Sequence, residues 1–279
     1  MPPFVHLHIH SDYSPMEGVS SVDALCQAVK AQGATTMALT DTNGLYGAIR
    51  FLQAARNVGI KPILGADVVF YYTPPSQASF HPPVPSLPRQ ALVPSDALLP
   101  QHHRVVLLAK TPDGYGNLCR LLSDRHRDRA FNLIDAVRRY RRGLICITDD
   151  EQALTAWAHE SAEDLYVELT PGPTMSAALA FSRRTGLPPV ATTRARFLHP
   201  AGFTVHRLLR AIALNTTLSR LSPSVCCAPM HWLMVGANVV RIRARVEGPR
   251  SRRYLRTGSN SQRLANATRG PIGISGPRN

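Results

Sequence analysis

The sequence predicts an α/β protein built as a closed barrel. Short apolar stretches alternate with amphipathic ones along the first 222 residues, a pattern typical of repeated strand–helix units around a parallel sheet. About seven such units in sequence favour a closed barrel over an open sheet, with functional groups at the C-terminal ends of the strands. A chain of 279 residues is also long enough to bury a sizeable core.

The elements follow one another in a regular order. A first strand covers residues 4–9. A helix then begins at the capping sequence SSVD of residues 20–23 and ends at Gly33, and its apolar residues recur at i, i+3, i+4 and i+7. The later strands are expected over residues 36–40, 61–69, 104–109, 143–148, 164–170 and 189–192. The later helices are expected over residues 47–57, 115–123, 132–141, 151–159, 175–185 and 204–214.

Two stretches break the alternation of strands and helices. Residues 73–100 hold eight of the 23 prolines and have no helix or strand period, so we expect an exposed loop or surface excursion there. Residues 224–279 scatter Arg, Gly, Ser and Asn without period and cannot bury enough apolar area to offset their ordering entropy. We therefore expect a single domain over residues 1–222 and a tail over 223–279 that is disordered, or that reflects a lost reading frame.

The charge is large but unevenly placed. The formal net charge is +14, of which the ten Arg and one Glu of residues 224–279 supply +9, which leaves +5 for residues 1–223. A basic tail invites a nucleic-acid interpretation, and a solvated tail without a partner is the alternative. Five cysteines without Cys-x-x-Cys spacing fit reduced thiols. Neither a signal peptide nor a membrane span is predicted, so a cytoplasmic location is expected.

Histidine and carboxylate side chains gather at the expected strand ends. The His-x-His spacing at the end of the first strand places two imidazoles on one side, and neutral histidine is the commonest protein ligand of transition metals. Carboxylates at the same rim would complete a divalent-metal cluster that activates water at a phosphoester. Asp41 and Asp149, also at strand ends, equally fit the role of helix N-caps. The candidate metal ligands are His8, His10, Glu17, Asp67 and Asp150.

The order of motifs resembles a known family. Residues 4–14, FVHLHIHSDYS, resemble the opening motif of the PHP (polymerase and histidinol phosphatase) domain in the version found at the N-terminus of bacterial DNA polymerase III alpha subunits. Later stretches resemble further parts of that domain in the same order, so that the likeness covers roughly residues 4–221. These stretches are ALTD (38–41) with GA (47–48), GIKPILGAD (59–67), RVVLLAK (104–110) with GYGNL (114–118), and HRLLRAI (206–212).

The resemblance implies a distorted (β/α)7 PHP-type barrel that holds up to three metal ions, Zn or Mn. It also implies a parent protein that extends DNA, with DNA and other replication subunits as partners. The nucleotidyltransferase residues of that family lie far beyond the PHP domain, and this chain offers no candidates for them.

Several family ligands are replaced in this chain. Thr42 stands where a histidine is usual, and Arg194 and Arg196 stand where the last motif offers Asp and His. Arginine cannot be deprotonated in a protein, so it cannot ligate a metal and repels cations. We therefore expect a weak or lost metal site, with Arg194 and Arg196 able to bind phosphate through bidentate hydrogen bonds.

Three functions compete. The first is the PHP domain, as a fragment, of a replicative or error-prone DNA polymerase III alpha subunit, inactive by itself. The second is a stand-alone PHP-type metal-dependent phosphoesterase, which Thr42, Arg194 and Arg196 count against. The third is a nucleic-acid-binding module that uses the basic tail.

Overall fold

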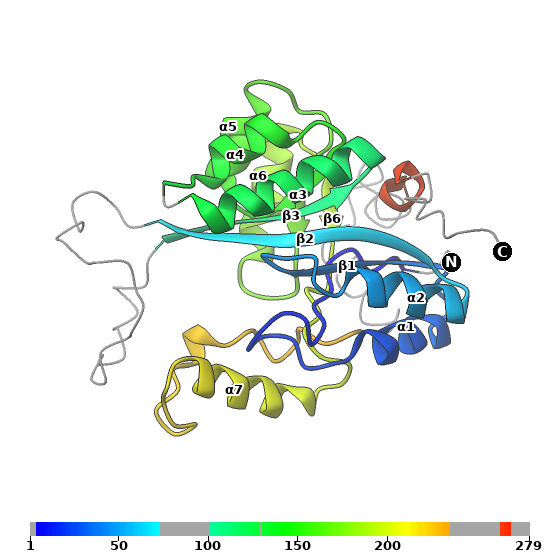
Figure 1. The fold of residues 1–279 in the computed structure, drawn as a ribbon. Coiled ribbons are helices and arrows are strands. Elements are labelled where there is room, and N and C mark those ends of the chain that lie inside the picture. Colours follow the sequence, from blue (N-terminus) through cyan, green and yellow to red (C-terminus); the bar gives the residue numbers. More distant parts are fainter. Residues whose placement is uncertain (1–3, 73–100, 129, 235–262, 269–279) are drawn as a thin grey trace, which may run out of the picture.

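Six strands form one sheet in the part of the chain that the structure describes, and their order in the sheet is their order in the sequence (Figure 1). The computed structural model describes residues 4–72, 101–128, 130–234 and 263–268. The strands are β1 (Thr36–Thr42), β2 (Lys61–Tyr72), β3 (Gln101–Ala109), β4 (Leu144–Thr148), β5 (Leu165–Leu169) and β6 (Pro189–Ala191).

The sheet is mixed, so the expectation of a wholly parallel sheet is wrong at β3. β1 pairs with β2, β4 with β5 and β5 with β6 in parallel, whereas β3 is antiparallel to both β2 and β4. A parallel connection needs a crossover, usually a helix, and the proline-rich sequence between β2 and β3 has no helix period. The loop expected over residues 73–100 lies outside the described residues.

The N-terminal segment spans the open side of the curled sheet. Residues 4–9, expected to be a strand, form isolated parallel bridges instead: His6 pairs with Met37 in β1, and Ile9 pairs with Ala195 beyond β6. The Ala38 amide donates to the His6 carbonyl (2.8 Å) and the Ala195 amide to the His8 carbonyl (3.0 Å). The sheet is thus a half-barrel crossed by its own N-terminus, and the predicted distorted barrel is confirmed in this form.

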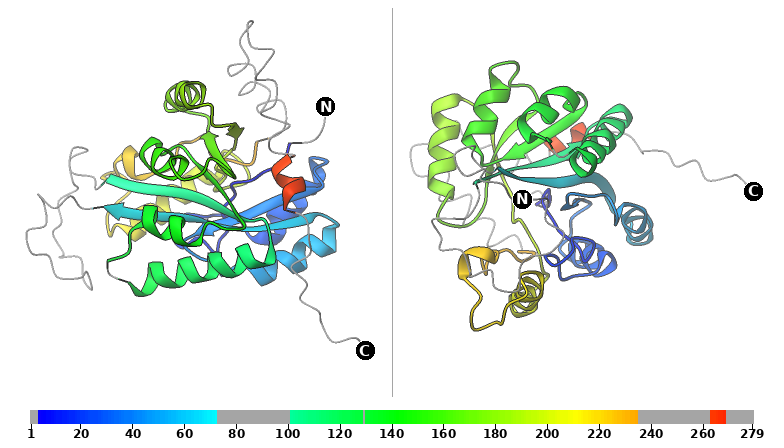
Figure 2. Two further views of the ribbon diagram at one scale, coloured as in Figure 1. Left: turned by 90° about the horizontal axis from the view of Figure 1, so that it is seen from above. Right: turned by 60° about the vertical axis from the view of Figure 1, so that its left-hand side comes forward.

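The helices cover the outside of the half-barrel. α3, α4, α5 and α6 lie on one side of the sheet, whereas α1 and α2 pack together beside β1 (Figures 1 and 2). Gly59 and Gly186 end α2 and α6 in the left-handed conformation, with φ of 68° and 76°, which costs glycine no steric strain. The helices are α1 (Val22–Ala31), α2 (Ala48–Val58), α3 (Pro112–Arg127), α4 (Leu133–Tyr140), α5 (Glu151–Ala158), α6 (Met175–Thr185) and α7 (Gly202–Ala213).

Apolar side chains fill both faces of the sheet. The outer face packs on α3–α6 around the fully buried Trp157, and a second cluster joins α1 and α2 to β1 around Phe51. Inside the half-barrel, buried side chains of five strands meet, among them Ile63, Val106 and Ile147. Leu264 of the short helical segment at 263–268 packs into the same interior cluster.

Part of the sequence beyond residue 222 packs against the domain. A short 3-10 helix covers Pro223–Val225, Trp232 bridges Phe197, and Leu233 is 2% exposed. The boundary predicted at residue 222 stays a prediction, and residues 235–262 and 269–279 lie outside the described residues.

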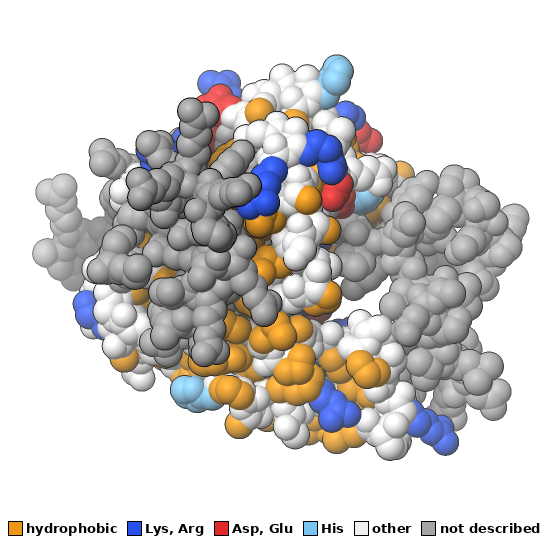
Figure 3. Space-filling model, turned by 180° about the vertical axis from the view of Figure 1, so that it is seen from behind, with side chains coloured by type: hydrophobic (Ala, Val, Ile, Leu, Met, Phe, Trp, Pro, Cys, Tyr) orange, Lys and Arg blue, Asp and Glu red, His pale blue; other side chains and the backbone are white. Residues whose placement is uncertain are grey.

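α7 leaves an apolar stripe uncovered by the described residues. Val205, Leu208 and Ile212 are 46%, 48% and 56% exposed. The helix lies at the lower edge of the molecule in Figure 1, and the view from behind shows hydrophobic side chains along this lower region (Figure 3). No helix among the described residues is long and apolar enough to cross a membrane.

Candidate metal centre

Strand alternation brings polar side chains into one end of the half-barrel. Side chains two or four residues apart on a strand face the same way. Asp67 therefore shares a face with Ile63 of the interior cluster, Arg104 with Val106, and Glu168 with Tyr166, which packs on that cluster. Because β3 runs antiparallel, its early residue Arg104 lies at the end where the parallel strands finish.

Three ligand atoms converge at this end. His8 Nε2, His10 Nε2 and Asp67 Oδ2 lie 3.0, 3.4 and 3.3 Å apart, and the three residues are 0% exposed. A tetrahedral ion with bonds of about 2.0–2.1 Å sets its ligand atoms about 3.3 Å apart. Two imidazole nitrogens and one carboxylate oxygen at this spacing fit a single Zn²⁺ or a similar ion, and this is the one His/Cys/Asp/Glu group of three within reach of an ion among the described residues.

The imidazole of His8 is oriented by a buried carboxylate. His8 Nδ1 donates to Glu168 Oε1 at 2.6 Å, and Thr192 Oγ1 donates to the same oxygen at 2.5 Å. An ionised carboxylate only accepts hydrogen bonds, so Nδ1 of His8 carries hydrogen. In the neutral ring, Nε2 then offers its lone pair to the ligand cluster. Carboxylate support of this kind fixes the ring orientation and tautomer of metal-binding histidines.

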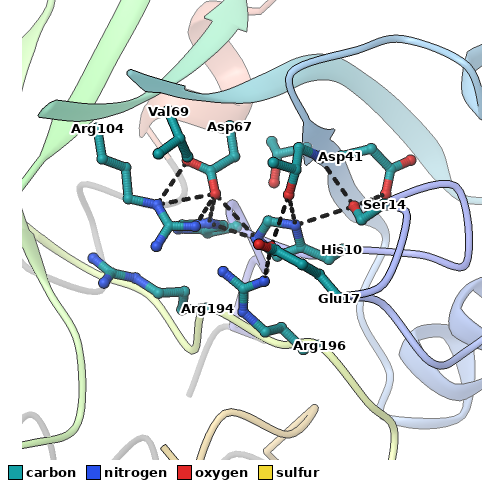
Figure 4. Close-up of polar contacts among 12 residues, drawn as sticks. His10, Ser14, Glu17, Asp41, Asp67, Val69, Arg104, Arg194 and Arg196 are labelled. Carbon is teal, nitrogen blue, oxygen red and sulfur yellow. Dashed lines mark hydrogen bonds and ion pairs between the residues drawn. The ribbon is translucent and has the colours of Figure 1, made fainter. Parts of the chain in front are cut away.

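Three arginines lie around the cluster (Figure 4), and each pairs with its own carboxylate. Arg104 binds Asp67, Arg194 binds Glu168, and Arg196 binds Glu17. Arg194 also donates to Asp149 Oδ2 at 3.2 Å. The pairing neutralises the guanidinium charges locally, and it occupies carboxylate oxygens that a cluster of several metal ions would need.

The buried charges keep the carboxylates ionised. Burial raises the pKa of Asp67, but the charge and the hydrogen bonds of Arg104 outweigh it and hold that pKa well below its usual range. The pKa of Glu168 is likewise lowered, because the Arg194 charge and the hydrogen bonds from His8 and Thr192 outweigh its burial. Burial raises the pKa of Glu17, but the charge of Arg196 outweighs it, and the pKa of Glu17 is lowered to about 2. The carboxylates of Asp67, Glu168 and Glu17 are therefore ionised at neutral pH, which is the form that binds a cation.

The imidazole of His10 is neutral. Burial, followed by the charge of Arg196, lowers the pKa of His10 to about 3. A neutral ring is the form that ligates metals.

Comparison with known protein families identifies the family of this chain. The model of the PHP domain matches residues 6–169, more than half of the chain. The chain belongs to the PHP domain family. The likeness noted from its motifs is thereby confirmed.

Relatives of this PHP domain are much longer proteins. A DNA polymerase III subunit alpha of Buchnera aphidicola (strain APS) is 28% identical over 240 residues, which cover 76% of this chain and 19% of that protein. The subunit alpha of Borreliella burgdorferi is 32% identical over 147 residues, 51% of this chain and 12% of the other. The chain thus spans a fifth or less of the length of these relatives.

A solved structure shares a coarser likeness. An amidohydrolase from Chromobacterium violaceum, solved with bound sulfate and no metal, is 13% identical, with a TM-score of 0.44 over 67% of this chain and 86% of the other.

The PHP domain gathers three of the five predicted ligands. Glu17 lies near them, but its carboxylate pairs with Arg196 and accepts from Thr42 Oγ1 at 3.0 Å. Asp150 accepts from the Ala153 amide at the start of α5 and pairs with His103 at 2.5 Å. Both stay predictions as ligands, although the structure gives their oxygens other partners.

The helix caps fall elsewhere than expected. Asp150 is the N-cap of α5, whereas Asp149 pairs with Arg194. Asp41 accepts from Ser11 and Ser14, and the N-cap of α2 is Gly47, which makes no side-chain cap hydrogen bond. The proposal that Asp41 and Asp149 cap helices is therefore wrong, because both side chains turn toward the polar end of the half-barrel.

Two site residues were missed from the sequence. Glu168 is the one acidic residue within the apolar stretch of β5, and such an isolated buried charge is itself a signal. Arg104 opens a stretch for which the sequence predicts a parallel strand, and that direction places it at the opposite end of the barrel.

Proposed function

We propose that this chain acts as the PHP domain of a DNA polymerase III alpha-type protein, with a structural role and at most a single metal ion. The observation that carries the proposal is the set of three Arg–carboxylate pairs around His8 and His10. They stabilise the polar end of the half-barrel without a cluster of ions. DNA and other replication subunits would then be partners of the longer protein, in the cytoplasm.

A single ion would be held by His8, His10 and Asp67. The three atoms have the spacing and the donor chemistry for it, and such an ion would supply Lewis-acid polarisation of a phosphate oxygen. Around it, Glu168 orients His8, while Arg104 competes for Asp67 Oδ2. The competition predicts weak occupancy rather than a hydrolytic centre.

The alternative is a stand-alone phosphoesterase, and the convergent ligand triad favours it. The two functions separate in one experiment on the full chain. Metal content is measured for the wild-type protein and for His8→Ala/His10→Ala, and hydrolysis of p-nitrophenyl phosphate and of a 3′-end-labelled DNA strand is followed with added Mn²⁺ or Zn²⁺. We expect no metal-dependent turnover. Turnover that His8→Ala abolishes would establish the phosphoesterase.

Phosphate binding at Arg194 and Arg196 belongs to the same proposal. Their Nε atoms are buried and have no hydrogen-bond partner among the described residues, which favours an anion. Glu168 and Glu17 already bind the two guanidinium groups, and a phosphate has to compete with them. Inorganic phosphate is expected to raise the melting temperature of the wild type more than that of Arg194→Gln/Arg196→Gln.

A further inference from the structure

We propose that Ser14 and Thr42 are positioning residues of the metal site. Their hydroxyl oxygens hold His10 in the tautomer that carries hydrogen on Nδ1 and directs the Nε2 lone pair at His8 and Asp67. The inference deepens the proposed function, since it rests on a metal ion bound by His8, His10 and Asp67.

The hydrogen bonds of Ser14 leave one role for His10. Ser14 Oγ donates its single hydrogen to Asp41 Oδ1 at 2.7 Å and accepts from the Thr42 amide at 3.0 Å. His10 Nδ1 lies 3.2 Å from the same oxygen (Figure 4). A hydroxyl has one donor and two lone pairs. With its hydrogen given to a carboxylate, Ser14 Oγ accepts from His10 Nδ1–H.

The hydrogen bonds of Thr42 independently place the His10 hydrogen on Nδ1. Thr42 Oγ1 donates to Glu17 Oε2 at 3.0 Å and lies 3.2 Å from His10 Nδ1. Hydrogen bonds to ionised carboxylates are roughly twice as strong as neutral ones, so the hydroxyl hydrogen stays with Glu17. The Thr42 oxygen is then a second acceptor for His10 Nδ1–H.

Asp41 holds Ser14 in this arrangement. Its Oδ1 also accepts from the Ser11 amide at 2.7 Å, and its Oδ2 accepts from Ser11 Oγ at 2.9 Å. The Asp41 side chain is 2% exposed. The Asp41 carboxylate accepts hydrogen bonds from three donors and has no hydrogen of its own to donate. In the Ser14–Asp41 hydrogen bond, Ser14 is therefore the donor.

The consequence is a site that is electrostatically incomplete. Glu168 fixes the hydrogen of His8 on Nδ1, and Ser14 with Thr42 fixes that of His10 on Nδ1. Two Nε2 atoms 3.0 Å apart then face each other and Asp67 Oδ2 with lone pairs. A cation bound between them, either a metal ion or a proton, satisfies the three atoms together. Thr42 stands where the family motif usually has a histidine, and here it supports a ligand instead of being one.

The tautomer is tested directly by ¹⁵N-resolved NMR of the histidine rings in the full metal-free chain at pH 7. In the wild type, hydrogen is expected on Nδ1 of His10. A neutral ring with its hydrogen on Nε2 alone overturns the proposal whether or not the protein binds metal. This measurement needs no variant and is independent of folding defects.

Variants test the link to metal binding. Ser14→Ala/Thr42→Val removes both acceptors and is expected to move the His10 hydrogen to Nε2 and to weaken Zn²⁺ binding 10–100-fold. Thr42→Ser keeps the hydroxyl and should retain both properties. Ser182→Ala, which removes a buried hydroxyl bonded to the Leu187 carbonyl far from the site, controls for general loss of packing.

The outcomes separate this inference from the proposed function. A double variant that keeps the Nδ1 tautomer, or that keeps full Zn²⁺ affinity, overturns the positioning role. The other outcome is a wild-type protein that has the predicted tautomer but binds no Zn²⁺. That result confirms the tautomer assignment but overturns the single-metal function. It also overturns the role of the two hydroxyls in metal binding.

Discussion

Arg104 and Asp67 lie on adjacent antiparallel strands, and the guanidinium donates to both carboxylate oxygens. Arg104 Nε approaches Asp67 Oδ1 at 2.8 Å and Oδ2 at 3.0 Å, and a terminal nitrogen also reaches Oδ2. Oδ2 is the atom that faces both histidine Nε2 atoms. One oxygen therefore serves a fixed arginine and a prospective metal ion.

Replacing Arg104 should increase metal affinity. Arg104→Gln removes the competing cation, and Zn²⁺ affinity measured by calorimetry is expected to rise at least about tenfold, a gain of about 1.4 kcal/mol. Without metal the variant should be less stable by about 3 kcal/mol, because a buried carboxylate loses its partner. Saturating Zn²⁺ should restore the melting temperature. Unchanged affinity would show that Arg104 and the ion do not compete.

Asp67 and Asp150 should behave differently, although both were predicted ligands. Asp67→Asn is expected to abolish metal binding. Asp150→Ala is expected to keep it and to lose about 1 kcal/mol of stability through the missing cap of α5. Metal analysis and urea unfolding of the two purified variants check this. Loss of metal in Asp150→Ala would restore Asp150 to the ligand set.

The sequence predicts the elements well and the site less completely. Local periodicity and caps locate the helices and strands, because each depends on neighbours a few residues away. The half-barrel closure depends on contacts between residue 9 and residue 195, which no local pattern encodes. Glu168 carries a local signal, as the one acidic residue in the apolar stretch of β5, whereas the position of Arg104 depends on the direction of its strand. Strand direction decides which end of the barrel a side chain occupies, and the direction of β3 was inferred from its neighbours.

Acid should destabilise the fold through buried neutral histidines. Burial first, and the charges of Arg194 and Arg196 next, lower the pKa of His231 to about 2. Its pKa is lower folded than unfolded, so below about pH 6.5 the unfolded chain takes up a proton that the native chain does not. Stability is therefore present above that pH and is lost as the pH falls.

The contribution of one histidine can be isolated. As the pH falls from 6 to 4.5, each buried histidine with a lowered pKa reduces the free energy of unfolding by about 1.4 kcal/mol per pH unit. His231→Asn should reduce the measured slope by about this amount, whereas the exposed control His159→Asn should leave it unchanged. Burial also lowers the pKa of His6, to about 4, so part of the slope persists. An unaltered slope in His231→Asn would contradict the burial of that ring.

The segment beyond residue 222 should contribute to stability. The Leu233 amide donates to the Phe197 carbonyl at 2.9 Å, Gln32 Nε2 donates to the Leu233 carbonyl at 3.4 Å, and the Leu233 side chain packs into the cluster around Phe51. Leu233→Ala is expected to cost about 2–4 kcal/mol. Leu214→Ala, at a site that is 41% exposed, should cost well under 1 kcal/mol.

Limited digestion with trypsin measures where the protected domain ends. After the exposed Arg220, the next Lys or Arg in the sequence is Arg241, so the C-terminus of the stable fragment reports directly on the residues between them. Packing of residues 231–234 against Phe197 predicts slow cleavage at Arg220, so that the stable fragment extends beyond that residue. Leu233→Ala, which weakens that packing, should speed cleavage at Arg220, and Leu214→Ala should not. A wild-type fragment that ends at Arg220 and keeps the full unfolding free energy would instead support a domain boundary near residue 222, because cleavage without loss of stability means that the removed contacts contribute nothing to the fold.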